Sequence, residues 1–536
     1  MPTTYESPSS APAPFTASAP KKQPRDRATS GSIWLDLLCL LVLAIVLLPK
    51  IITPDFAPDS WSYFELSKSV FSDFYKTNTV RQFQFEPPYG TSFPPLYPIL
   101  IAVTRLVVDA GVYTGMFLNA AFAVATLFSL KRLAGALSLP IWTGNILMLL
   151  LLASFDYDDE ITGAGSFPLA LLLLSIALTS LVNSANTGKP RAFWLGLTAG
   201  LFCLARFDML LVAGALGVIS WLFIGGWSWK STLCYYATFA LVLAPWIAYS
   251  QTHFGKPLVS DNSRTVLSVD RTYVMDYFPS GKNPETLLDR PLPWIKNLFL
   301  QRLPPVIGAA LSVIYNYFPV MLLGGVLLGL ALAGNRPDCK TLWQSAEGQA
   351  LIAFGLALSL QIIAVWLTGY RDRRYFIPIT WYGTVVSLYL ILRTPSVAPW
   401  FARLKIAGTL CLALLTVGFY VREVSFKPLM GEILWRLDPK LLGEEQFAAL
   451  TAELENTAKE PRLLNVSGDL NPFQFGALTG KTTIPKPSNL DEHNATSFIE
   501  HYGVTHILDA DNWLIDKLPG TMKKEKLSTP GLWRVK

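Results

Sequence analysis

Long apolar runs, separated by short polar stretches, recur along most of the chain. The first extends from Ile33 to Leu48. The others lie near residues 113–130, 139–154, 165–182, 192–206, 208–225, 230–249, 308–333, 348–367, 376–392 and 405–421. A helix needs about 20 predominantly apolar residues to cross roughly 30 Å of hydrocarbon, and most of these runs approach that length. The pattern predicts a mainly α-helical, polytopic membrane protein with about eleven transmembrane helices.

The composition supports a membrane protein and excludes an ordinary soluble enzyme. Of the 536 residues, 51% are hydrophobic and 15% are charged, and the mean hydropathy is +0.37. Soluble domains are about 25% charged. The net charge of +6 indicates no nucleic-acid partner, because membrane proteins concentrate Lys and Arg on the cytoplasmic side. All five cysteines precede the C-terminal segment, so we expect no disulfide framework there.

Basic residues between the predicted helices set the orientation of the chain. The basic loops fall on one side if the apolar run Pro94–Val108 does not cross the membrane. These loops carry Lys131/Arg132, Lys189/Arg191, Lys230, Arg336/Lys340 and Arg403/Lys405. The positive-inside rule assigns that side to the cytoplasm. We therefore expect Pro94–Val108 to lie in the outer interface, and loops 49–111 and 250–303 to lie outside, together with the C-terminal segment.

Three parts of the chain differ in character. Residues 1–32 are rich in Pro, Ser and Ala and carry a basic cluster, which is typical of a disordered arm, here cytoplasmic. Residues 33–426 form the predicted transmembrane module. Residues 427–536 are predicted to form a small α/β domain outside the membrane. Its expected elements are helices at Glu444–Lys459 and Asn494–Tyr502, and strands at Arg462–Val466, Thr482–Pro485 and Thr505–Leu508.

The first outer loop contains an acidic and an aromatic residue four positions apart. At this spacing, Asp59 and Tyr63 would share one face of a helix. A purely structural interpretation is equally good. In it, Asp59 caps the helix N-terminus, Ser62-x-x-Glu65 resembles a capping box, and the nearby aromatic residues suit an amphipathic helix at the membrane surface. Spacing alone leaves both interpretations open.

A second concentration of charge is the run 155–160, which contains Asp156, Asp158, Asp159 and Glu160. A carboxylate near the bilayer centre costs roughly 2.5–3.5 kcal/mol, so four together, at about 10 kcal/mol, must reach water or cations. One interpretation is an acidic outer loop. The other is a second group of carboxylates that converges on Asp59, around a divalent cation bound through oxygens. The Asp-x-Asp spacing alone identifies no metal and no ligand set.

Three arginines, Arg371, Arg373 and Arg374, lie at the outer start of a predicted helix, against the positive-inside trend. One interpretation is that their side chains extend to lipid headgroups. The other is that they bind the phosphate of a lipid-linked substrate, since Arg forms bidentate hydrogen bonds to phosphate. The same alternatives apply to three further outer-loop arginines, Arg81, Arg264 and Arg271.

These residues lie in stretches that resemble the bacterial GT-C glycosyltransferases, specifically the superfamily of protein O-mannosyltransferases and lipid A aminoarabinose transferases (glycosyltransferase family 39-like). The matching stretches occur in order between residues 33 and 400. They are Pro58-Asp59 to Tyr63, Phe93-Pro94-Pro95-Leu96-Tyr97, Leu204-Ala205-Arg206-Phe207-Asp208, Pro245-Trp246 to Pro257, and Arg374-Tyr375-Phe376-Ile377-Pro378. The C-terminal segment, with Tyr502-Gly503-Val504, also resembles tails found on these enzymes.

The resemblance implies an inverting membrane glycosyltransferase that moves one sugar from a polyprenyl-phosphate carrier to a glycan, lipid or protein acceptor. The reaction would take place on the outer face of a bacterial inner membrane. Asp59 would be the general base, with Asp158, Asp159 or Glu160 as a second catalytic acid. Arg374, Tyr375 and Tyr97 would stabilise the leaving phosphate, and Tyr63 and Arg81 would be further substrate-binding residues.

Two positions depart from the family pattern. Many relatives carry a lone acid just before the fourth span, where this chain has Gly163-Ala164-Gly165-Ser166-Phe167-Pro168. Which of Asp158, Asp159 and Glu160 replaces that acid stays open. The aminoarabinose transferases carry Lys before Pro-Pro-Leu-Tyr, whereas this chain has Phe93, which disfavours lipid A as the acceptor.

The alternative function is a multi-pass transporter or a flippase for lipid-linked sugars. The sequence contains no Gly-rich phosphate loop, so it gives no sign of a nucleotide-driven pump. Transporters bury ionisable residues near the membrane midplane. Here the unusual charge is predicted at the outer edge, which favours the enzyme.

Overall fold

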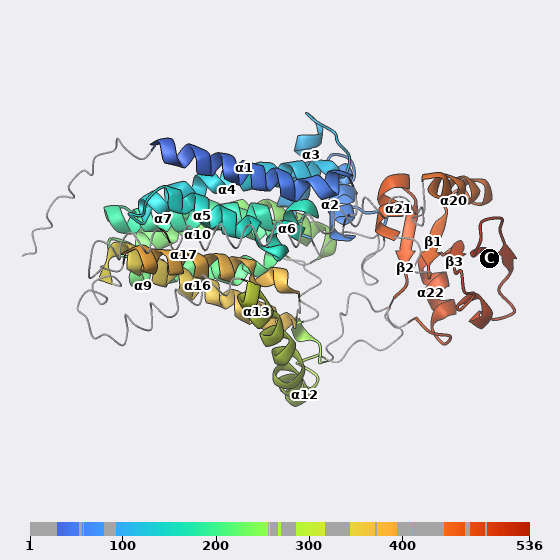
Figure 1. Ribbon diagram of the computed structural model, residues 1–536. Coiled ribbons are helices and arrows are strands. Elements are labelled where there is room, and N and C mark those ends of the chain that lie inside the picture. The colour runs from blue at the N-terminus through green and yellow to red at the C-terminus, as the bar shows by residue number, and fades with distance from the viewer. Residues whose placement is uncertain are drawn as a thin grey trace, which may run out of the picture.

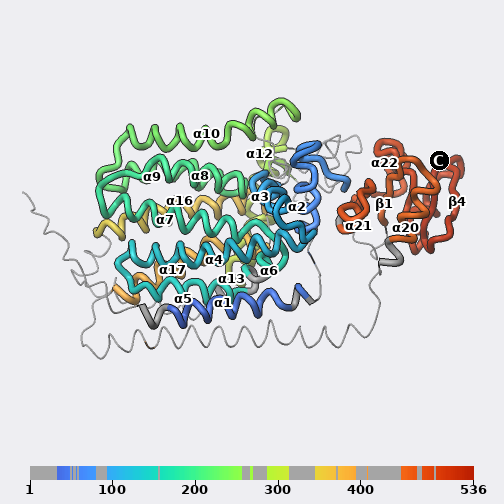
Figure 2. The backbone as a smooth tube through the Cα atoms, turned by 90° about the horizontal axis from the view of Figure 1, so that it is seen from above, coloured from blue at the N-terminus to red at the C-terminus, as the bar shows by residue number. Residues whose placement is uncertain are grey.

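The computed structural model describes residues 29–52, 56, 58–79, 93–255, 257, 266–269, 286–316, 344–369, 372–393, 407, 444–466, 472–487 and 490–536. In these residues, long helices lie side by side in one elongated bundle, and a five-stranded sheet forms a C-terminal domain at one end of it (Figure 1, Figure 2). We call the end of the bundle nearest that sheet the domain end.

The described helices of the bundle fall in the predicted apolar runs. They are α1 (Thr29–Ile52), α4 (Tyr113–Ala136), α5 (Trp142–Leu152), α7 (Phe167–Thr187), α8 (Ala192–Ala205), α9 (Leu210–Phe223), α10 (Trp229–Phe254), α13 (Leu303–Asn316), α16 (Ala346–Thr368) and α17 (Ile377–Arg393). Within the described residues, five segments are long and apolar enough to cross a membrane: Tyr113–Ala136, Phe167–Thr187, Trp229–Phe254, Ala346–Thr368 and Arg373–Arg393. The count of about eleven stays a prediction, because the run 405–421 and most of 308–333 lie outside the described residues.

The ends of these helices carry ordinary capping signals. At the start of α16, the Ser345 hydroxyl accepts the N–H of Gly348 at 3.0 Å, which satisfies one free donor of the first turn. The same helix ends at Gly369, whose φ of +70° is a left-handed conformation that glycine adopts without strain. Local sequence therefore defines where this span begins and ends.

Three short helices lie at the domain end of the bundle: α2 (Pro58–Ser69), α3 (Leu96–Arg105) and α6 (Phe155–Thr162) (Figure 1). The ambiguous run Pro94–Val108 forms α3, which has ten residues. At 1.5 Å per residue, α3 is about 15 Å long, half the thickness of the hydrocarbon core. Helix α3 alone is therefore too short to cross the membrane, and so is the eleven-residue α5. The location of Pro94–Val108 in the outer interface stays a prediction.

A buried arginine anchors part of the loop 250–303 to the bundle. Arg302 ends a π-helical turn, η3 (Leu298–Arg302), between α12 (Pro291–Asn297) and α13, and it is 1% exposed. Its guanidinium donates to the carbonyls of Val266, Ser268 and Leu367. Among the described residues no carboxylate pairs with it. The segment 266–269 is thereby tied to the end of α16.

The C-terminal domain has strand order β2-β1-β3-β5-β4. Its elements are α20 (Glu444–Thr457), β1 (Arg462–Asn465), α21 (Pro472–Thr479), β2 (Thr482–Pro485), α22 (Ala495–Tyr502), β3 (His506–Leu508), η6 (Ile515–Lys517), β4 (Lys524–Lys526) and β5 (Leu532–Val535). β1 pairs in parallel with β2 and β3, and β5 pairs antiparallel with β3 and β4. Its core packs Leu464, Ile484 and Ile507 of the parallel strands against Phe498 of α22.

The helices and strands predicted for this segment match α20, α22, β1, β2 and β3 within one or two residues. The sequence reasoning missed α21, β4 and β5. β4 reads Lys-Glu-Lys at the edge of the sheet, so it shows none of the apolar alternation by which strands are detected.

Candidate active site

A cavity of about 330 Å³ lies among the ends of several helices of the bundle, next to α2 and α6. The apolar part of its wall includes Cys203, Leu210, Leu211, Leu243, Val365 and Leu367. The polar part consists of charged and hydroxyl groups: Asp59, Tyr63, Glu160, Ser166, Arg206, Asp208, Arg374 and Tyr375. Such a mixed cavity suits an amphiphilic ligand, one with a charged head and an apolar chain.

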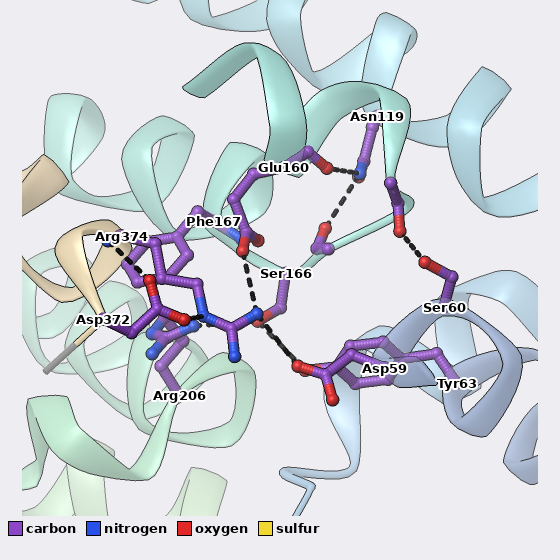
Figure 3. A network of polar contacts seen from close by, with 12 residues as sticks. Asp59, Ser60, Tyr63, Asn119, Glu160, Ser166, Phe167, Arg206, Asp372 and Arg374 are labelled. Carbon is purple, nitrogen blue, oxygen red and sulfur yellow. Dashed lines mark hydrogen bonds and ion pairs between the residues drawn. The ribbon is translucent and has the colours of Figure 1, made fainter. Parts of the chain in front are cut away.

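Arg374 connects the carboxylates of this cavity (Figure 3). It lies in η4 (Arg373–Phe376), just before α17. Its Nη1 is 2.9 Å from Asp59 Oδ2 and 3.3 Å from Glu160 Oε1, and its Nε is 2.6 Å from Asp372 Oδ2. Because these partners come from α2, α6 and the turn before η4, the fold joins three distant motifs in one cluster. Because Arg374 contacts the carboxylates of Asp59 and Glu160 in the cavity, the interpretation that it extends to lipid headgroups does not fit.

Asp59 and Tyr63 both line the cavity, as their spacing predicts. Helix α2 begins at Pro58, so Asp59 belongs to its first turn, where a negative charge is favoured by the helix dipole. The capping-box interpretation of Ser62-x-x-Glu65 is wrong. Glu65 is 3% exposed and accepts the backbone N–H of Asn78, thirteen residues further along the chain.

Of the two acids of the run 155–160 whose side chains are described, Glu160 and Asp159, it is Glu160 that pairs with Arg374. Its carboxylate is 4% exposed, whereas Asp159 is exposed and does not line the cavity. The side chains of Asp156 and Asp158 lie outside the described residues. Burial raises the pKa of Glu160 to about 7, although the nearby Arg374 and Arg206 favour its ionised form.

Gly165 makes room for this carboxylate. A Cβ at Gly165 would lie 1.8 Å from Glu160 Oε2, far inside any contact distance. The Glu160 carboxylate also accepts the N–H of Phe167 at 3.4 Å. Glu160 thus fills the space over the stretch in which relatives are expected to carry their lone acid. Any side chain at position 165 would therefore clash with the Glu160 carboxylate in this position.

Four other predicted site residues have different surroundings. Tyr63 donates to Ser166 Oγ at 3.2 Å, and Tyr375 lines the cavity beside Arg374. Tyr97 is fully buried and does not line the cavity. Its hydroxyl donates to the carbonyl of Gly115 at 3.2 Å, and the centroid of its ring lies 4.9 Å from that of the Tyr63 ring. Its position supports Tyr63 and offers no hydroxyl to the cavity. Arg81 lies outside the described residues.

The sequence reasoning did not include Arg206 and Asp208 among the site residues. Arg206 Nε is 3.0 Å from Asp208 Oδ1, and its Cζ lies 3.5 Å from the centroid of the Phe167 ring. Gln361 holds Asp208 from α16, with Nε2 at 3.2 Å from Oδ2. The sequence contained a signal for both residues, because an ionisable pair between two apolar segments indicates a functional site by default.

The cluster has an unequal charge balance. Among the described residues that form ion pairs at the cavity, Asp59, Glu160, Asp208 and Asp372 carry four negative charges when ionised, against two positive charges on Arg206 and Arg374. Protonation of Glu160, an added cation, or both would reduce the excess. Within the described residues no group of three or more His, Cys, Asp or Glu side chains gathers as a metal site. The divalent cation therefore stays a prediction.

The similar solved structures are membrane glycosyltransferases. The oligosaccharyltransferase AglB of Archaeoglobus fulgidus, in complex with an inhibitory peptide and a dolichol-phosphate, has a TM-score of 0.58 at 12% identity, over 89% of this chain and 69% of that one. ArnT of Cupriavidus metallidurans, bound to undecaprenyl phosphate, has a TM-score of 0.50 at 13% identity, over 95% and 98%. The chain has the GT-C glycosyltransferase fold.

A third structure, the Archaeoglobus fulgidus oligosaccharyltransferase tethered with an acceptor peptide, has a TM-score of 0.54 at 13% identity, over 88% of this chain and 68% of that one. No protein-family model matches the chain. A search of curated proteins found no match either. The resemblance stated from the sequence motifs is thus confirmed at the level of the GT-C fold, and the chain is a multi-pass membrane protein.

Proposed function

We propose that the protein transfers one sugar, with inversion, from a polyprenyl-phosphate carrier to an envelope glycan, lipid or protein acceptor. We place the reaction on the outer face of the bacterial inner membrane. The observation that supports this function best is Arg374, which bridges Asp59 and Glu160 in a cavity that apolar residues also line. Two proteins with the same fold bind polyprenyl phosphates, namely dolichol-phosphate in AglB and undecaprenyl phosphate in ArnT.

In this proposal the donor phosphate binds Arg374, with Tyr375 beside it, and the first isoprene units lie along the apolar wall. Arg374 contacts both Asp59 and Glu160 through Nη1, and in this proposal a phosphate oxygen binds at Nη1 and competes with these carboxylates there. The phosphate thereby displaces Asp59 from Arg374. Asp59 loses a positive neighbour, and its affinity for a proton rises at the moment that the donor is in place.

The transfer step then follows from the positions of these groups. Asp59 takes the proton of the acceptor hydroxyl, and the acceptor oxygen attacks the anomeric carbon of the sugar. The bond from that carbon to the phosphate oxygen breaks, and its electron pair stays on the phosphate. Arg374 stabilises the added negative charge, which is the larger task because phosphate is already a good leaving group. Attack from the side opposite the phosphate inverts the anomeric carbon.

Among the remaining predicted residues, Glu160 is the second carboxylate of the proposal, since Asp159 is exposed and does not line the cavity. Tyr63 contacts the substrate and Tyr97 supports its ring from behind. Arg81 and Asp158 stay proposed substrate and acid residues. A divalent cation, if bound, would take oxygen ligands from Asp59 and Glu160, whose two carboxylates already meet at one point.

The test is release of carrier phosphate from a radiolabelled polyprenyl-phosphate sugar by purified protein, with envelope extract from a deletion strain as the acceptor source. Asp59→Asn keeps the size of the side chain and removes the base. We expect turnover to fall by roughly two to four orders of magnitude. Asp73→Asn is the matched control, because Asp73 is exposed and pairs with Lys76 outside the cavity. Turnover of Asp59→Asn close to that of the wild type would contradict the assignment.

A further inference from the structure

The edge strand β2 of the C-terminal sheet is paired with chain from the first outer loop. Thr79 and Thr483 form a parallel bridge. The N–H of Thr483 donates to the carbonyl of Asn78 at 3.1 Å, and Thr483 Oγ1 donates to Thr79 Oγ1 at 3.3 Å. An extended segment readily adds to a sheet edge, because the edge offers unpaired N–H and C=O groups. The segment that follows α2 thus continues the sheet of the C-terminal domain.

Helix α2 itself also contacts this domain. Lys68, in its last turn, donates from Nζ to the carbonyl of Ala477 in α21. This carbonyl belongs to the last turn of α21, where carbonyls lack helical partners and the helix dipole attracts a cation. Figures 1 and 2 show α21 as the element of the domain that faces α2.

The fit between the two parts is tight at Gly476. A Cβ at this position would lie 2.6 Å from Thr79 Oγ1 and 2.8 Å from Thr483 Oγ1. These distances are shorter than real side-chain contacts, so only glycine lets α21 approach the pair. The position is sensitive because it lies where the loop segment, α21 and β2 meet.

Glu65 links the same segment back to α2. Its buried carboxylate accepts the N–H of Asn78, while the carbonyl of Asn78 accepts from Thr483. Asn78 is therefore held on one side by α2 and on the other by β2. Glu65 and Asp59 lie on one twelve-residue helix, six residues or about 9 Å apart.

We propose that the C-terminal domain is a positioning element for α2, and through it for Asp59. This inference rests on the proposed function, in which Asp59 is the base. The Ser60 hydroxyl, next to Asp59, donates to the carbonyl of Gly163 in the bundle. The other end of α2 is held by Lys68 and, through Asn78, by Glu65. With both ends held, α2 keeps its tilt, and a displacement of 1 Å at a reacting group costs about 100-fold in rate.

The test uses Gly476→Ala in the full-length protein. The substitution favours helix α21 intrinsically, so a loss of function would not come from a weaker helix. We expect faster hydrogen exchange at the amide of Thr483, which donates to Asn78, with unchanged exchange at Leu464 in the core of the domain. We also expect kcat to fall roughly 10- to 100-fold, with little change in the KM for the donor.

Two further variants make the test specific. Thr79→Ala and Thr483→Ala together remove the two hydroxyls that the new Cβ meets at 2.6 and 2.8 Å, so adding both to Gly476→Ala should recover slow exchange at the amide of residue 483 and much of kcat. Gly520→Ala is the control in the same domain, since a Cβ there meets nothing within 4 Å. Faster exchange at Thr483 with an unchanged kcat would overturn the positioning role, as would unchanged exchange at Thr483. The exchange measurement does not depend on catalytic activity. It therefore tests the contact between the domain and α2 even if Asp59 proves not to be the base.

Discussion

The sharpest consequence of the site geometry concerns Gly165, which leaves space for the Glu160 carboxylate. In Gly165→Ala the new Cβ would meet Glu160 Oε2 at 1.8 Å, against at least 3.4 Å for ordinary contact, so the carboxylate must move by about 1.6 Å. Glu160 accepts hydrogen bonds from Arg374 at 3.3 Å and from the N–H of Phe167 at 3.4 Å. These distances are already near the upper limit for a hydrogen bond, so neither bond can lengthen further. Both should break.

The magnitude follows from the type of interaction lost. A hydrogen bond to a charged group contributes about 1.5–3 kcal/mol, which corresponds to roughly 10- to 150-fold in an equilibrium or rate constant. If Glu160 holds Arg374 ready for the donor phosphate, kcat/KM for the labelled donor should fall by that factor in Gly165→Ala. Glu160→Ala should show a similar loss for the same reason.

The decisive measurement is the double variant. Glu160→Ala leaves the space beside Gly165 empty. The double variant should therefore have nearly the same activity and thermal stability as Glu160→Ala alone. Gly135→Ala is the control, because a Cβ there meets nothing within 4 Å. Wild-type kcat/KM in Gly165→Ala, or fully additive losses in the double variant, would refute the role of Gly165 as the place for the Glu160 carboxylate.

Four further predictions test other parts of the structure. The first concerns topology and uses single-cysteine variants in a background without native cysteines. Variants at the exposed positions Asp159 and Gly520 should react with an impermeant thiol reagent added to intact cells, whereas a variant at Thr187 should react only after lysis. Labelling of the Thr187 variant in intact cells would invert the topology. Arg206→Lys should raise the Kd for polyprenyl phosphate about tenfold, because Lys lacks the planar group that stacks on the Phe167 ring; an unchanged Kd would leave Arg206 a purely structural role. Burial lowers the pKa of His506 to about 4, so the domain should lose stability as pH falls from about 6.5 to 4 in tryptophan-fluorescence melts, and His506→Gln should flatten that dependence. Transfer should survive exhaustive chelation, because Arg374 already places positive charge between the two carboxylates; a loss that Mg²⁺ or Mn²⁺ reverses would show that a cation is required.

Local patterns in the sequence predict much of this structure. Apolar run length locates the bundle helices, and the four-residue spacing of Asp59 and Tyr63 places both on the cavity wall. The choice among the acids of the run 155–160 was beyond sequence reasoning. It depends on the turn of α6 that buries Glu160 and exposes Asp159.

Other features could not be predicted because their causes are tertiary. The partner of Glu65 lies thirteen residues away in an irregular segment, so the local capping-box pattern was misleading. The meeting of Thr79 with Thr483 joins positions 404 residues apart, and no periodicity encodes it. Arg206 was different, since its charge between two apolar segments was visible in the sequence and should have been included.

The buried guanidinium of Arg302 has a consequence for how the catalytic cycle ends. It bonds to the carbonyls of Val266 and Leu367, two residues of the cavity wall, and among the described residues it has no carboxylate to neutralise it. Its field therefore reaches the cavity and adds to that of Arg206 and Arg374. Under the proposed function, the donor is a phosphodiester with one negative charge, whereas the spent carrier is a monoester with nearly two at neutral pH. The guanidinium of Arg302 thus offsets part of the negative charge of the four carboxylates, and this favours the doubly charged spent carrier more than the singly charged donor.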